Sequence, residues 1–112
     1  MKKWPWLKRK LHLWGELWTV VVKKDPRTDE GERVLGYFDP QKRQILLDEG
    51  QPDILGLWTL FHEIIHRAEE VLGLNLREKH VDRLARTLWA FWLDNPGAVY
   101  AIAKWMNGRA GK

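Results

Sequence analysis

The sequence predicts an α+β fold, in which a small antiparallel sheet of three to four strands precedes two long helices and a shorter C-terminal helix. Segments before Gly50 are rich in β-branched and aromatic residues, which is typical of strands. After Gly50 the apolar residues recur at helical spacing. The length of 112 residues, without an internal repeat, predicts a single domain with a sheet over residues 11–49 and helices over residues 52–107.

Four segments are expected to form the strands: residues 11–14, 17–23, 33–38 and 43–47. Gly15 and Glu16 suit a tight turn between the first two segments. Asp39 and Pro40 suit a turn between the last two. We therefore expect neighbouring strands to pair in an antiparallel sense.

Capping residues indicate where the helices begin and end. Pro52 suits a first helical turn, because its missing N–H has no partner there in any case, and Gly73 suits a C-cap. Asn75 and Glu78 have the spacing of a capping box, and Pro96 begins a new helix directly after the second one. The helices are therefore expected over residues 52–72, 76–94 and 96–106.

The net charge of +4 comes from the two ends of the chain. Residues 1–10 carry five basic residues and residues 104–112 carry three, and neither segment contains an acid. Residues 11–103 carry 11 basic and 15 acidic residues. This distribution does not favour a nucleic-acid partner, because the folded middle of the chain is acidic.

Several classes of protein are excluded by composition. The chain has no cysteine, which excludes disulfides, zinc–thiolate sites and thiol nucleophiles. No apolar run is long enough to span a membrane or to act as a signal peptide, so we expect a cytoplasmic protein. The basic Trp/Lys terminus at residues 1–10 is expected to place its two tryptophans against the domain.

A metal-binding motif, His62-Glu63-Ile64-Ile65-His66, lies within the first long helix. Histidines four residues apart share one helical face and can bind one ion. Neutral imidazole suits Zn²⁺, which acidifies water, and a neighbouring carboxylate can then accept the proton. The motif therefore predicts that His62 and His66 bind zinc and that Glu63 is the general base.

A catalytic zinc ion needs a third protein ligand. Glu69 and Glu70 lie one turn beyond His66 and are better placed to hydrogen-bond to a ligand imidazole. The remaining candidates lie on the second helix, whose expected core stripe is Val81, Leu84, Leu88 and Phe91. Relative to this stripe His80 lies at the near edge, Glu78 lies on the opposite flank and Asp82 faces solvent. We therefore expect His80 to be the third ligand, with Glu78 as the alternative.

The segment Phe61-His-Glu-Ile-Ile-His66, followed by His80-Val-Asp-Arg-Leu-Ala85, resembles the compact HExxH zincins of gluzincin type. These include the minigluzincins, the ImmA/IrrE-like metallopeptidases and small phage metallopeptidases. The resemblance implies that two histidines bind zinc, that the motif glutamate is the base, and that the third ligand is usually a glutamate at the place His80 occupies. The chain departs from the pattern of these families at two positions. One is His80, and the other is Arg67, where the families usually have an uncharged residue. The likeness extends more loosely over residues 11–96.

The predicted function is that of a zinc-dependent metallopeptidase that hydrolyses a peptide or protein substrate with metal-activated water. An edge strand, residues 43–47, is expected to pair with the substrate backbone. Tyr37, Tyr100 and His12 are the candidates for stabilising the oxyanion, and nothing in the sequence chooses among them. Three alternatives remain: a catalytically silent zinc-binding module, a protein that binds DNA through its basic ends, and a latent peptidase whose tail after Pro96 covers the cleft, as in minigluzincin zymogens.

Overall fold

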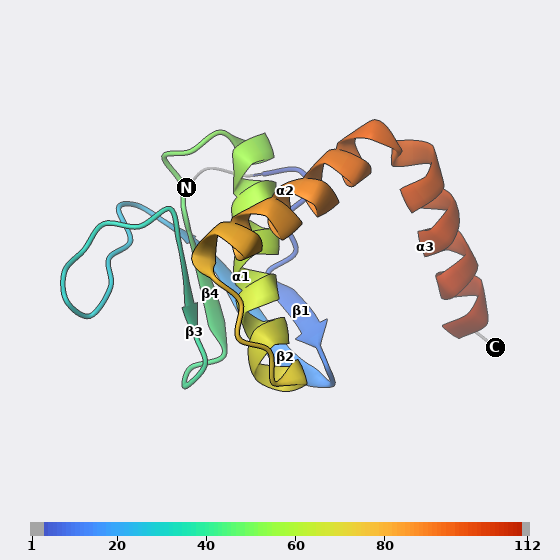
Figure 1. The fold of residues 1–112 in the computed structure, drawn as a ribbon. Helices are drawn as coiled ribbons and strands as arrows, with labels where there is room; N and C mark the ends of the chain where they lie inside the picture. Colours follow the sequence, from blue (N-terminus) through green and yellow to red (C-terminus); the bar gives the residue numbers. More distant parts are fainter. Residues whose placement is uncertain (1–3, 111–112) are drawn as a thin grey trace.

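The computed structural model describes residues 4–110 of the chain, and the outermost residues of the two basic ends lie outside this range. Seven elements follow one another, and Figure 1 shows them in order. The strands are β1 (Lys10–Leu13), β2 (Glu16–Lys23), β3 (Gly36–Asp39) and β4 (Gln44–Asp48). The helices are α1 (Asp53–Leu72), α2 (Glu78–Asp94) and α3 (Pro96–Ala110). The predicted α+β class, with two long helices and a shorter last one, is confirmed.

The sheet is mixed, whereas we expected an antiparallel one. Its strand order is β1-β2-β4-β3, in which β2 and β4 run parallel and the other two pairs run antiparallel. The β3–β4 hairpin places β4 beside β2 because β4 carries the most deeply buried apolar residues of the sheet, Ile45 and Leu47, both 0% exposed. The strand that we expected at an edge is therefore central, and β1 and β3 are the edge strands.

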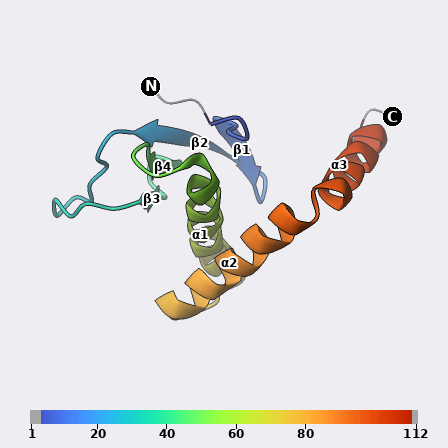
Figure 2. The same cartoon turned by 90° about the horizontal axis from the view of Figure 1, so that it is seen from above.

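The helices form two layers on one face of this sheet. Helix α1 lies against the sheet, and α2 crosses α1 on the side away from the sheet (Figure 2). The main core lies between the sheet and α1 and contains Trp4, Trp18, Val20, Val22, Ile45, Leu47 and Leu60. A second, smaller core joins α1 to α2 through Ile65, Val81 and Ala85.

The N-terminal segment packs against the start of α1, as the sequence predicted for its tryptophans. Trp4 is 3% exposed, and the indole N–H of Trp6 donates to the carbonyl of Asp53 over 2.8 Å. A side chain at Gly56 could not fit, because its Cβ would lie 2.5 Å from the Trp4 ring. The glycine thus allows the terminus to cover the first turn of α1.

The helix boundaries follow the predictions with two differences. Gly73 ends α1 in the left-handed conformation, with φ of 68°, as expected for a C-cap. Helix α2 begins at Glu78, two residues later than predicted, because the amide of Leu76 donates to the Glu69 carboxylate instead of entering a helix. The N-cap is Arg77 without a side-chain hydrogen bond, so the predicted capping box of Asn75 and Glu78 is wrong. Helix α3 continues through Gly108 to Ala110.

Candidate metal centre

Helix α1 places the two motif histidines one turn apart on the face that meets α2. Their Nε2 atoms lie 3.2 Å apart, and their ring centroids lie 4.9 Å apart. Both side chains are partly buried, with His62 15% and His66 28% exposed. The lone pairs of two imidazoles therefore converge, as the spacing of the motif predicted.

The third group at this place is the carboxylate of Glu78, from the first turn of α2. One oxygen lies 2.6 Å from Nε2 of His62, and the other lies 3.4 Å from Nε2 of His66. Ligand atoms of these three residues all lie within 4.8 Å of one another. His80, which we expected as the third ligand, is exposed and does not belong to this group. The structure therefore favours the alternative, Glu78.

The face that α2 turns toward α1 explains this correction. Val81 and Ala85 are both 0% exposed, and with Glu78 they define one face at the spacing i, i+3 and i+7. Leu84 and Leu88, which we assigned to the core stripe, are 47% and 42% exposed. The packed face is thus rotated from the predicted one toward Glu78 and away from His80.

A carboxylate lies within hydrogen-bonding distance of the Nδ1 atom of each motif histidine. Nδ1 of His62 lies 2.8 Å from Asp82, a residue that we predicted to face solvent. Nδ1 of His66 lies 3.1 Å from Glu69, one of the two residues that we expected to support a ligand imidazole. Glu69 also accepts the amide of Leu76 over 2.9 Å, so the residues before α2 are tied to the same carboxylate. When Nδ1–H donates to a carboxylate, the Nε2 lone pair is free to bind a cation.

The donor set fits a small divalent cation of the zinc type. Ligand atoms about 2.0–2.1 Å from a tetrahedral zinc ion lie about 3.3 Å from one another. The Nε2–Nε2 distance of 3.2 Å and the distance of 3.4 Å from His66 to Glu78 match this value. The 2.6 Å between His62 and Glu78 is shorter and has the length of a hydrogen bond. Two imidazoles with one carboxylate form a set found in catalytic zinc sites, where a fourth position is open.

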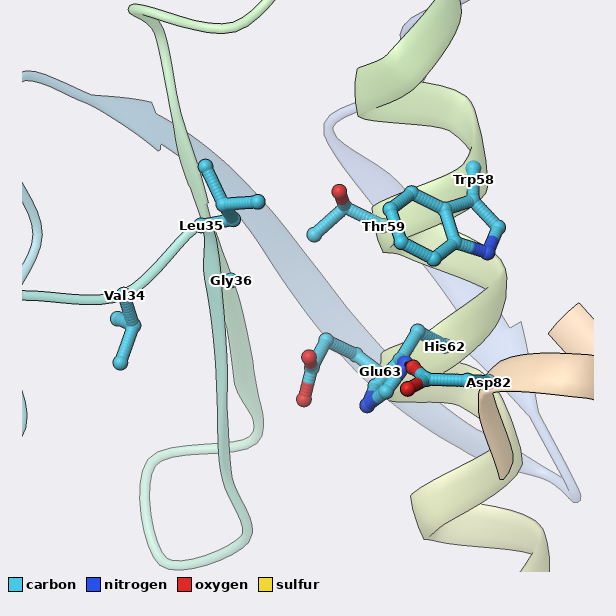
Figure 3. A pocket seen from close by; sticks show the side chains of 8 residues that line it. All are labelled: Val34, Leu35, Gly36, Trp58, Thr59, His62, Glu63 and Asp82. Carbon is cyan, nitrogen blue, oxygen red and sulfur yellow. The ribbon is translucent and has the colours of Figure 1, made fainter. Parts of the chain in front are cut away.

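Glu63 faces a pocket beside this group, between α1 and β3. The pocket has a volume of about 260 Å³, and Figure 3 shows the Glu63 carboxylate extending from α1 toward β3. Its lining residues are Val34, Leu35, Gly36, Trp58, Thr59, His62, Glu63 and Asp82. A side chain at Gly36 would place its Cβ 2.5 Å from Thr59 and 3.2 Å from a Glu63 oxygen, so this glycine leaves room for the carboxylate.

Burial governs the charge state of Glu63, which is only 7% exposed. Desolvation raises the pKa of its carboxyl, the charges of His62 and His66 act in the opposite direction, and Glu78 raises the pKa further. The net result is a pKa above the ordinary value of 4.5. A carboxylate with a raised pKa is a stronger proton acceptor than a solvated one, which suits a general base.

No protein-family model, no curated protein and no solved structure matches the chain.

Arg67, the charged residue after the second motif histidine, has a structural role. Its guanidinium pairs with Glu16 of β2 and, over 2.7 Å, with Glu70 on its own helix. It also lies over the ring of the buried Trp18, 5.4 Å from the ring centroid. Arg67 therefore fastens α1 to the sheet and does not enter the metal centre.

None of the three candidates for oxyanion stabilisation lines the pocket. Tyr37 is on β3, but it alternates with Gly36 and Phe38, which face α1, so it belongs to the opposite face of the sheet. His12 is exposed on β1, at the other edge of the sheet, and Tyr100 is 69% exposed on α3. Helix α3 itself extends away from α1 and β3 (Figures 1 and 2), which supply most of the pocket lining.

Proposed function

We propose that this chain is a zinc-dependent metallopeptidase of the HExxH zincin type, with His62, His66 and Glu78 as zinc ligands and Glu63 as the general base. The observation that carries the proposal is the paired orientation of the histidines. Each ring directs Nε2 to a shared point beside Glu78 while a carboxylate holds its Nδ1. Both ring nitrogens of each histidine have a carboxylate nearby, which is typical of metal-binding histidines and not of solvated ones.

Each residue has a distinct task in peptide hydrolysis. Zn²⁺, when bound, is a Lewis acid that polarises a peptide carbonyl and lowers the pKa of water. Glu63 accepts the proton of the attacking water at its carboxylate and then delivers it to the leaving amine. Asp82 and Glu69 keep the imidazoles in the tautomer that ligation requires. The low exposure of Glu63 keeps bulk water from competing for its proton.

The free edge of the sheet provides a place for the substrate backbone. Strand β3 is the edge strand on the side of the pocket, and residues 34–36 form the pocket wall that faces α1. An extended peptide that pairs with this edge lies along the cleft, within reach of Glu63. Val34, Leu35 and Trp58 make much of the wall apolar, which favours an apolar side chain next to the scissile bond.

Glu63→Gln tests the proposal most directly. We expect the variant to keep one zinc ion per chain by elemental analysis and to lose turnover of a mixed peptide library by about 10²- to 10⁴-fold. Glu70→Gln is the matched control, because Glu70 is on the same helix but exposed and paired with Arg67. Zinc binding without cleavage by the parent protein would favour a silent binding module, and absence of zinc from the parent would remove the centre altogether.

A further inference from the structure

Helix α3 exposes an apolar surface that its own chain does not cover. Tyr100, Ile102, Trp105 and Met106 are 69%, 53%, 60% and 57% exposed. The helix adjoins the end of α2 and projects away from the sheet and from α1 (Figures 1 and 2). Ile102, Trp105 and Met106 share one side of the helix, and Tyr100 lies on the other side. Three adjacent large apolar side chains exceed the scattered single residues that soluble monomers tolerate.

The composition of α3 makes it a weak helix in isolation. It has 15 residues, among them Gly97 and Gly108, and isolated helices of this length are marginal in water even when rich in alanine. Each glycine costs about 1 kcal/mol relative to alanine. The helix therefore needs packing on another surface to be stable, and the rest of its own chain provides little.

A matching apolar surface lies on the other two helices. Leu84, Leu88 and Phe91 of α2 are 42–48% exposed, although their spacing, continued from Val81, is that of a helix–helix seam. Leu84 and Leu88 border a groove of about 280 Å³ whose other walls come from Ile65, Ala68, Leu74 and Leu76. The lining of this groove is almost entirely apolar.

The chain connection keeps α3 out of this groove. Only Asn95 separates α2 from α3, and both its backbone N–H and its side-chain amide donate to the carbonyl of Phe91 over 3.0 Å. An antiparallel helical hairpin needs a loop of about two to five residues. Helix α3 therefore cannot fold back along α2 to cover Leu84 and Leu88 of its own chain.

We propose that the occupant of the groove is α3 of a second copy of this chain, so that two copies exchange their last helices in a symmetric dimer. In a two-fold dimer the same contact forms twice, which covers both grooves and both α3 helices. One kind of contact, α3 of one copy in the groove of the other, therefore covers both the exposed side of α3 and the groove bordered by Leu84 and Leu88.

The area available supports this occupant. Ile102, Trp105 and Met106 share one side of α3, and each is more than half exposed. An exposed tryptophan contributes on the order of 100–200 Å² to such a contact. Because each protomer contributes both an α3 face and the exposed Leu84, Leu88 and Phe91, the two contacts together approach the ~800 Å² per partner of a stable dimer.

The first experiment measures mass in solution by sedimentation equilibrium on the full chain. We expect a species of twice the 13.3 kDa chain mass at micromolar concentration, and a monomer for Leu88→Asp and for Ile102→Asp. Leu17→Asp is the matched control, because Leu17 is 47% exposed on the sheet, away from the helices, and should leave the dimer intact. Circular dichroism identifies any variant that fails to fold.

The second experiment uses the absence of native cysteine and milder substitutions. Chains with Leu88→Cys are mixed with chains carrying Ile102→Cys and oxidised, and we expect a disulfide between unlike chains. A monomeric parent protein, a dimer that survives both aspartate substitutions, or cross-linking only between like chains would overturn the proposal. So would a parent protein that is monomeric alone and binds anionic vesicles through α3.

Discussion

The two faces of α2 differ in burial although both carry regularly spaced side chains. One face, with Glu78, Val81, Asp82 and Ala85, packs on α1 and supplies carboxylates to the histidines. The other face, with Leu84, Leu88 and Phe91, has the stronger apolar pattern and is about half exposed. An apolar stripe therefore does not by itself show which face of a helix packs against its neighbour in the same chain.

The packed face is distinguished by a small residue. Ala85 is fully buried and lets α2 approach α1 closely, which brings the carboxylates of Glu78 and Asp82 within hydrogen-bonding distance of His62. A larger residue would hold the helices apart. No helix within residues 4–110 combines the length and the apolarity that crossing a bilayer requires.

The largest expected effect separates Glu78 from His80, which lie two residues apart on opposite sides of α2. Glu78→Ala removes a proposed zinc ligand and should weaken zinc binding by more than about 100-fold, since substitution of residues that only support ligands already costs 10- to 100-fold. His80→Ala should leave the affinity unchanged, because His80 is exposed outside the group. Competition titration with a zinc chelator measures both. Equal losses, or a loss with His80→Ala alone, would restore our original expectation.

The next effect tests the support that α2 gives to His62. Asp82→Asn keeps the size of the side chain but removes the charge that accepts from Nδ1 of His62, and we expect zinc affinity to fall by about 10- to 100-fold. Asp94→Asn, at the exposed end of the same helix, is the control. An unchanged affinity for Asp82→Asn would show that the contact does not orient the ring for ligation.

The stability of the two faces should also differ. Val81→Ala opens space in a fully buried position and should lower the free energy of unfolding by about 2 kcal/mol. Leu84→Ala, at a half-exposed position, should cost less than about 1 kcal/mol in dilute protein. Urea denaturation at two protein concentrations separates the faces further. The cost of Leu84→Ala should grow with concentration if a second copy covers this leucine, whereas that of Val81→Ala should not.

The sequence was sufficient for features that depend on local geometry. Strands β1, β2 and β4, the Gly73 cap and the convergence of His62 with His66 follow from the local pattern of one element. Strand β3 begins at Gly36, three residues later than predicted. The place of β4 beside β2 and the choice of Glu78 over His80 depend on how separate elements pack. Helix periodicity allows two faces of α2, and the packing of Val81 and Ala85 against Ile65 of α1 decides between them. The spacing of Glu78, Val81, Asp82 and Ala85 was the signal that could have indicated the correct face.

The smallest expected effect concerns the side of α1 that faces the sheet. There an ion pair between Arg67 and Glu16 joins the helix to β2. Glu16 of β2 accepts from Arg67 and lies 3.2 Å from Arg43. Desolvation acts to raise the pKa of its carboxyl, but hydrogen bonds from Trp18 and Arg67 and the charges of Arg43 and Arg67 lower the pKa below its ordinary value of 4.5. Because the pKa is lowered in the folded state, this group stabilises the fold above the pKa of the unfolded chain, and the contribution is lost as the pH falls through the folded value.

Glu16→Gln should therefore make the unfolding free energy less dependent on pH below about pH 4.5, with little change in the shape of the profile above it. Urea denaturation across this range measures the slope. The double variant Glu16→Gln, Arg67→Gln should show no further flattening, because both substitutions remove the same contact. A slope that matches the parent protein would mean that the packing of Trp18 and Leu60 alone holds α1 on the sheet. The charged face of α1 would then be dispensable for stability, unlike the carboxylates that α2 contributes to the metal centre.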